Sequence, residues 1–407
     1  MTVVGLSEVE ARILDRISAA DLVADATRLI AAGGENPGDT EQAGQEVLAD
    51  LCRAAGGRPV VTEFLPGRPN LLARFGSGGG PPVLFLGHSD VVPAGVGWDR
   101  SPFAATVAGG RLVGRGAADM KGGLAAVVAA LRAIAAEGLA PRVDLLSTGD
   151  EEDRALGVQH HLRSGEAGGG GYLACLVAEP TDLAVVTAAR GAANLVLRIH
   201  GQAAHAGNPD DGRSAIVAGA EVVRLVTDEH RAWWAAPPPA PVGRSSWNVG
   251  LIQGGTGTSI VADSCVLHLD RRLLPGEDAD AVLVDLLDRA RATDAFADGV
   301  SAEGEVDMFM PGFTTDPGSR LVGTLLGCLS DAGGQPVTAV STGAFEAGFI
   351  AEHHGCPTVV LGPGDARGQA HRANESVDVA DLVLAARLYA LFVLRAASLA
   401  GESAVPG

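Results

Sequence analysis

Several short apolar runs in this chain end at histidine or carboxylate residues, and this recurrence limits the possible folds more than any other feature. Runs of four to eight apolar residues bounded by glycine or proline are typical of strands buried in a sheet. Four such runs lead to candidate metal ligands: 81–87 to His88 and Asp90, 142–148 to Glu151 and Glu152, 172–178 to Glu179, and 356–362 to His371. Because open parallel sheets bind ligands at the carboxyl ends of their strands, we expect these side chains to converge.

Helical spacing of apolar residues separates these predicted strands. It predicts helices over 7–30, 40–55 and 122–138, the last of which ends at Gly138. Strands that alternate with helices form a largely parallel sheet with helices on both of its faces. The predicted fold class is therefore α/β.

The pattern of apolar residues changes between residues 186 and 305. Apolar and polar residues alternate there as in half-exposed strands, and helical spacing returns between them, with strands at 193–201 and 264–273 and helices at 213–231 and 278–292. A chain of 407 residues is too long for one ordinary core. We therefore predict a catalytic domain in two parts with an α+β insertion between them: 1–185 and 306–407 for the catalytic domain, and 186–305 for the insertion.

Composition narrows the class of protein. The chain is 47% hydrophobic and carries a formal net charge of −19, which argues against binding to nucleic acid or to anionic membranes. Its five cysteines form no CxxC pair, which favours reduced thiols and a cytoplasmic location. We find no basic leader followed by an apolar stretch and no run of 18 apolar residues, so neither a signal peptide nor a membrane span is predicted.

Four consecutive acids, residues 150–153, stand directly after the strand predicted at 142–148. Like charges crowded at the end of a buried strand repel one another, so they need either a compensating positive charge or full contact with water. Two histidines and three carboxylates at one sheet edge are the ligand set of a hydrolytic zinc site that holds two ions. The chain offers His88 and His371 together with Asp119, Glu179 and the acids of 150–152. We expect Asp150 and Asp153 to face water.

A family resemblance supports this interpretation. Seven segments resemble, in order, the successive signatures of the M20 metallopeptidase family: GHSDVVP, GRGAADMKGG, TGDEE, AEPTD, AHAGNPDDG, DRRLLPGED, and GPGD followed by AH. That family includes acetylornithine deacetylase, succinyl-diaminopimelate desuccinylase, aminoacylase and the carboxypeptidase G-type enzymes. The resemblance covers nearly the whole chain, and the types of ligand match.

The resemblance implies a dinuclear site. His88 would bind one divalent cation and His371 the other, Asp119 would bridge them, and Glu152 and Glu179 would each complete one. The cations implied are two zinc ions per subunit, with cobalt as the alternative.

The resemblance also implies roles for the neighbours of these ligands. Asp90 would hold the ring of His88 through its second nitrogen. Glu151 would be the general base that takes a proton from a water molecule whose pKa zinc lowers to about 7. A cis peptide bond is expected after Asp119.

Further residues are implied on the substrate side. His205 would stabilise the oxyanion from the insertion of the other subunit, so the insertion would act as a lid and as the interface of a homodimer. Arg272, rather than its neighbour Arg271, matches the family position for binding the substrate carboxylate. Gly343 and Glu346 are predicted to line the pocket.

The leading hypothesis is a metal-dependent hydrolase that cleaves the amide bond of an N-acyl amino acid or a small peptide. A dipeptidase or carboxypeptidase of the same family is the alternative. A two-metal phosphoesterase would need basic residues or a glycine-rich loop with lysine at the same sheet edge, which the sequence does not show. A non-catalytic binding module would be expected to have lost ligands, whereas all five are present.

Overall fold

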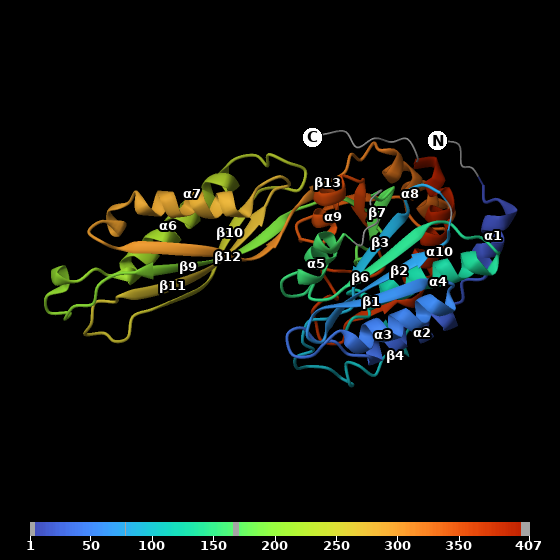
Figure 1. Ribbon diagram of the computed structural model, residues 1–407, viewed down its shortest axis with the longest axis horizontal. Helices are drawn as coiled ribbons and strands as arrows, with labels where there is room; N and C mark the ends of the chain where they lie inside the picture. The colour runs from blue at the N-terminus through green and yellow to red at the C-terminus, as the bar shows by residue number, and fades with distance from the viewer. Residues whose placement is uncertain (1–4, 78, 166–170, 400–407) are drawn as a thin grey trace. The chain divides into compact units, whose positions relative to one another are not determined.

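The computed structural model describes residues 5–77, 79–165 and 171–399. The chain divides into two compact units, and Figure 1 shows their elements. The first unit comprises Met1–Thr187, Thr314–Ala339 and Phe349–Gly407, and the second comprises Ala188–Phe313 and Val340–Gly348. The insertion predicted over 186–305 shares most of its residues with the second unit, but β12 (Ser301–Met310) continues beyond residue 305.

A mixed sheet lies at the centre of the first unit. Its strands are β1 (Arg58–Leu65), β2 (Arg68–Phe75), β3 (Val83–His88), β6 (Val143–Thr148), β7 (Ala174–Val177), β8 (Val185–Ala189), β13 (Phe313–Thr314), β14 (Thr338–Ser341) and β15 (Thr358–Val360). The order is β1-β2-β6-β3-β7-β15-β8-β13, with β14 paired to β8. A second, three-stranded sheet has the order β16-β5-β4, from β4 (Thr106–Ala108), β5 (Arg111–Val113) and β16 (Ser376–Asp378).

The predicted α/β class is confirmed, with a parallel centre and antiparallel edges. β6, β3, β7 and β15 run parallel, whereas β1 and β2 are antiparallel. All six residues of β3 and of β6 are buried, which explains why both read as continuous apolar runs instead of alternating ones. Because β3 and β6 run parallel, their carboxyl ends lie at the same edge of the sheet.

Helices pack around this sheet. They are α1 (Glu8–Asp15), α2 (Ala19–Ala31), α3 (Gln42–Ala54), α4 (Lys121–Ala136), α5 (Leu156–Ser164), α8 (Arg320–Asp331), α9 (Ala347–His354) and α10 (Val379–Arg395), followed by the 3₁₀ turn η3 (Ala396–Leu399). The prediction of a single helix over 7–30 is wrong, because α1 ends at Asp15 and Ser18 caps the start of α2 by accepting a hydrogen bond from the Asp21 amide. The side chain of a serine at this position satisfies an amide that would otherwise lack a partner.

The main hydrophobic core lies between the sheet and α4, α10 and α2 (Figure 1). Residues 379–399 are long and apolar enough, by length and composition alone, to cross a membrane. In the structure, Leu388, Tyr389, Leu391 and Phe392 of this segment are fully buried against the rest of the unit. The apolar character of α10 is thus used in the core.

The second unit is a four-stranded antiparallel sheet of order β10-β11-β9-β12, with two helices packed on it (Figure 1). Besides β12, the unit contains β9 (Gly191–His200), η1 (Pro209–Asp211), α6 (Ala215–Ala235), β10 (Ser246–Gly254), β11 (Ser264–Leu273), α7 (Ala279–Arg291) and η2 (Asp294–Phe296). Burial alternates along β11, as the apolar–polar alternation of the sequence predicts for a sheet covered on one face.

Candidate metal centre and catalytic site

The five predicted ligands meet at the carboxyl edge of the parallel strands. His88 is the last residue of β3, and its Nε2 lies 3.3 Å from Asp119 Oδ1 and 3.2 Å from Glu179 Oε1. His371 Nε2 lies 3.4 Å from Asp119 Oδ2 and 3.1 Å from Glu152 Oε2. Each imidazole therefore belongs to a group of three ligands, and Asp119 belongs to both groups.

These distances are in the range expected between ligands of one metal ion. Two ligand atoms bound to one tetrahedral zinc at about 2.1 Å lie roughly 3.4 Å apart. The separations between imidazole nitrogen and carboxylate oxygen in the two groups run from 3.1 to 3.4 Å, and the two oxygens of Asp119 face different imidazoles. The side chains are thus arranged for two cations that share one carboxylate.

Electrostatics at the site also favour positive charge. Hydrogen bonds to Asp119 and Glu152 raise the pKa of His371 to about 10. Burial opposes protonation of His88, but Glu179 and Glu151 overcome it and raise the pKa of this imidazole well above its usual value. Burial, reinforced by Asp119, raises the pKa of Glu179 to about 7. Bound cations would remove this conflict between burial and charge.

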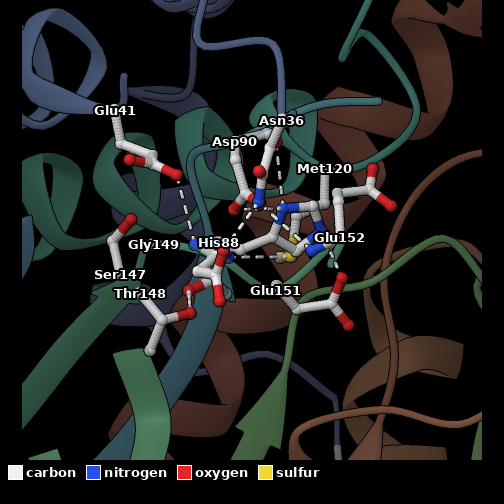
Figure 2. Close-up of polar contacts among 12 residues, drawn as sticks. Asn36, Glu41, His88, Asp90, Met120, Ser147, Thr148, Gly149, Glu151 and Glu152 are labelled. Carbon is white, nitrogen blue, oxygen red and sulfur yellow. Dashed lines mark hydrogen bonds and ion pairs between the residues drawn. The ribbon is translucent and has the colours of Figure 1, made fainter. Parts of the chain in front are cut away.

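Asp90 holds His88 in position. His88 Nδ1 lies 3.0 Å from the backbone oxygen of Asp90 and 3.5 Å from its Oδ1, which leaves Nε2 directed at Asp119 and Glu179. Asp90 Oδ2 accepts hydrogen bonds from the Glu152 amide and from Asn36 Nδ2, both at 3.0 Å (Figure 2). A partner on the second ring nitrogen fixes both the tautomer and the orientation of a ligating histidine.

The expectation that Asp150 faces water is wrong. Asp150 is only 3% exposed, and its Oδ1 accepts a hydrogen bond of 3.1 Å from Asn36 and lies 3.7 Å from Arg68 Nη1. Burial raises the pKa of Asp150. Asp153, in contrast, is exposed beside Arg154. The repulsion among these acids is thus relieved partly by an amide and a guanidinium from another part of the chain.

Glu151 stands next to the ligand Glu152 and close to one group of ligands. Its Oε2 lies 3.8 Å from His88 Nε2, and its side chain is partly exposed (Figure 2). A general base must lie within hydrogen-bond reach of the proton that it takes, and Glu151 lies beside the ligand group of His88.

The turn that carries Asp119 contains the expected cis peptide bond, Asp119-Met120, which is confirmed. The turn is held by Glu375, whose Oε1 accepts hydrogen bonds from the amides of Ala118 and Asp119 at 2.9 and 3.0 Å. Sequence reasoning missed Glu375 and also missed Asn36. Glu375 lies four residues after His371, and Asn36 lies directly before a proline. Neither position by itself indicates a contact with the residues of the site.

His205 lies in the second unit and is exposed. The amide of Gly207 donates a hydrogen bond of 3.0 Å to His205 Nδ1. A neutral imidazole that accepts at Nδ1 carries its proton on Nε2, so Nε2 is the nitrogen that can donate to a ligand.

Arg271 and Arg272 lie on opposite sides of β11, where burial alternates along the strand. Arg271 is buried, stacks on Trp233 and Trp247, and pairs with Glu277 at 2.6 Å. Arg272 is partly exposed and donates to Asp270 Oδ1 at 3.0 Å. The arginine that could still bind a ligand is therefore Arg272.

The remaining predicted residues, Gly343 and Glu346, also belong to the second unit. The Gly343 amide donates to Ser341 Oγ at 3.0 Å, and Glu346 is 2% exposed. Arg190 fixes this loop to the sheet by donating from Nε to the Thr342 backbone oxygen at 3.2 Å. Burial and the charge of Arg272 lower the pKa of Arg190.

Comparison with known proteins supports the interpretation of these residues as a hydrolytic metal site. Residues 84–395 match the model of peptidase family M20/M25/M40. The chain is 32% identical over 337 residues to an acetylornithine deacetylase of Aliivibrio fischeri (strain MJ11), covering 81% of this chain and 84% of the relative. It is 33% identical over 323 residues to the acetylornithine deacetylase of Pectobacterium atrosepticum, covering 76% and 79%.

Solved structures show the same fold. Aminopeptidase PepT of Bacillus cereus superposes with a TM-score of 0.75 and 25% identity, covering 94% of this chain and all of that one. A dinuclear metal-binding peptidase of Bacillus subtilis from the M20 family superposes with a TM-score of 0.68 at 17% identity, covering 92% and 97%. The chain therefore belongs to peptidase family M20/M25/M40 and is an amide-bond hydrolase of that family.

Proposed function

We propose that the protein binds two divalent cations, zinc or cobalt, and hydrolyses the amide bond of an N-acyl amino acid. The observation that carries this proposal is the pair of ligand groups that share Asp119: His88 with Glu179, and His371 with Glu152. When bound, the cations would polarise the scissile carbonyl group and acidify a water molecule.

The side chains around the cations divide the remaining work. Glu151 takes the proton of the attacking water and passes it to the leaving nitrogen. Asp90 keeps His88 oriented. His205, with Nε2 as its donor, stabilises the negative charge that develops on the carbonyl oxygen. Arg272 pairs with the substrate carboxylate through its planar fork. Gly343 and Glu346 line this side of the pocket.

The comparisons support an N-acyl amino acid as the substrate class, because the curated relatives described above are acetylornithine deacetylases. They also support the alternative of a small peptide, since the structural neighbour at 25% identity is an aminopeptidase. Both substrates present an amide bond near a free carboxylate. The five cysteines are all free, which supports a location in the reducing cytoplasm.

A homodimer formed through the second unit is part of the proposal. β10 is an edge strand, and we call the exposed apolar residues on and beside it the edge patch: Ile216, Val217, Leu251 and Ile252. Exposed edges with apolar side chains are sites of strand pairing between chains. A second copy bound there would bring its own His205 with it.

Substitution of the proposed base tests the function. Hydrolysis of N-acetyl, N-succinyl, N-carbamoyl and dipeptide substrates is measured with zinc or cobalt supplied. We expect Glu151→Gln to lower kcat by about 10²- to 10⁴-fold while the protein keeps its metal content.

Asp153→Asn is the matched control, because Asp153 is an exposed acid two positions along the same loop. It should retain the kcat of the unmodified protein. Unchanged turnover in Glu151→Gln would contradict the role of this residue as base, and absence of bound metal in the unmodified protein would contradict the proposed function itself.

A further inference from the structure

A buried glutamate holds the segment that carries the bridging carboxylate. Glu375 is fully buried, and its Oε1 accepts hydrogen bonds from the amides of Ala118 and of Asp119 itself. Two donors on one carboxylate oxygen fix the backbone on both sides of the peptide bond that leads into Asp119. The direction in which the Asp119 side chain leaves the chain therefore depends on Glu375.

The other oxygen of Glu375 pairs with a buried arginine. Arg115 Nη1 lies 2.5 Å from Glu375 Oε2, and Arg115 is only 1% exposed. Its guanidinium lies over the ring of Trp98, with Cζ 5.3 Å from the ring centroid. Removing one partner of a buried charge pair leaves the other charge without compensation, which strongly destabilises the folded protein. Glu375 and Arg115 therefore each need the other in order to remain charged and buried.

The pair joins three segments that carry ligands. Arg115 Nη2 donates to the backbone oxygen of Pro93 at 3.4 Å, in the loop that follows His88. Glu375 holds the Asp119 turn and lies four residues after His371. The amide of Gly114 also donates to the backbone oxygen of Glu375 at 2.9 Å. One charge pair thus ties together the backbone around three of the five ligands.

We propose that Glu375 and Arg115 are positioning residues, which orient Asp119 so that each of its oxygens faces a different cation. This inference rests on the dinuclear site of the proposed function. Neither residue is placed among the ligands, and the pair acts through the backbone. Partners that orient ligating carboxylates and histidines commonly change metal affinity by about 10- to 100-fold when they are removed.

Zinc binding provides the test. The metal-free protein and the variants Glu375→Gln and Arg115→Lys are titrated with zinc, and affinity and stoichiometry are measured by calorimetry. Glutamine keeps one oxygen as acceptor but loses the charge that pairs with Arg115, and lysine keeps the charge but loses the planar fork. We expect both variants to bind zinc about 10- to 100-fold more weakly than the unmodified protein.

Asp378→Asn is the matched control. Asp378 also pairs with an arginine at 2.5 Å, lies three residues from Glu375 and is half exposed, but it contacts none of the five ligands in the part of the chain that the structure describes. Its zinc affinity should stay within about twofold of the unmodified protein, since exposed pairs contribute little. Thermal unfolding of the metal-free proteins separates metal affinity from folding.

The outcomes are distinct. Weaker zinc binding in both variants, with circular dichroism like that of the control, supports the inference. Zinc affinity equal to that of the control overturns it, even if the variants unfold at lower temperature. If Glu375→Gln does not fold, Arg115→Lys decides in the same way. If the unmodified protein itself binds no zinc, the proposed function has failed, whereas two bound zinc ions with unaffected variants would refute only the positioning role.

Discussion

The amide of Asn36 lies between two buried carboxylates. Its Nδ2 donates to Asp90 Oδ2 at 3.0 Å (Figure 2) and to Asp150 Oδ1 at 3.1 Å, and its Oδ1 accepts from Arg68 Nη2 at 2.8 Å. Since Asp90 orients His88 and Asp150 opens the loop of Glu151 and Glu152, one neutral side chain connects the metal ligand to the proposed base. Such a network is stabilising when every member has a partner.

Asn36→Ala tests this arrangement. The substitution leaves two buried carboxylates facing each other without a shared donor, so we expect the free energy of unfolding to fall by about 1.5–3 kcal/mol. Urea unfolding of the metal-free protein measures this. Gln42→Ala, which removes only an exposed hydrogen bond within a helix, should change the free energy by less than about 0.5 kcal/mol. A loss no greater than that of Gln42→Ala would show that the Asn36 contacts are not important.

At the scale of helices and strands, the sequence predicts where candidate ligands gather, because His88 and Glu179 come at or just after the ends of buried strands and Asp119 comes just before a buried helix. The end of β3 places His88, and the start of α4 follows Asp119. The partners of these ligands could not be found in this way, since contacts such as Glu375 with the Asp119 amide join residues 256 positions apart. Burial of Asp150 depends on Arg68 and Asn36, which no local pattern connects to it.

The edge strand β10 is the proposed dimer interface, and a substitution there tests this proposal. Leu251 and Ile252 are 52% and 49% exposed, and they are expected to pair with a second copy. Ile252→Lys should therefore shift the protein from dimer to monomer in sedimentation and lower kcat, because His205 of the other copy is lost. Val284→Lys, on an equally exposed apolar residue of α7, is the control and should remain dimeric.

Mixed dimers test whether His205 acts across that interface. His205→Ala alone should lower kcat by about 10²- to 10³-fold, and Glu151→Gln alone should lower it by about 10²- to 10⁴-fold. A purified heterodimer of these two variants contains one site with Glu151 and the partner's His205, so it should recover about half of the activity of the unmodified dimer. A heterodimer as inactive as its parents would show that His205 acts within its own chain.

At the scale of the whole molecule, the two units should respond differently to metal removal. All five proposed ligands belong to the first unit, and a cation that binds only the folded form stabilises the unit that holds it. Adding zinc to the metal-free protein should therefore slow hydrogen exchange in α4, β3 and the loop of 149–155. Exchange in α7 and β11 of the second unit should be unchanged.

Protection by zinc should also depend on pH. The raised pKa of His371 indicates that its imidazole holds a proton in the absence of metal. Zinc must displace this proton, so the protection should weaken as the pH falls. Equal protection of both units would contradict a metal site confined to the first unit, and protection independent of pH would contradict the displacement of imidazole protons by zinc.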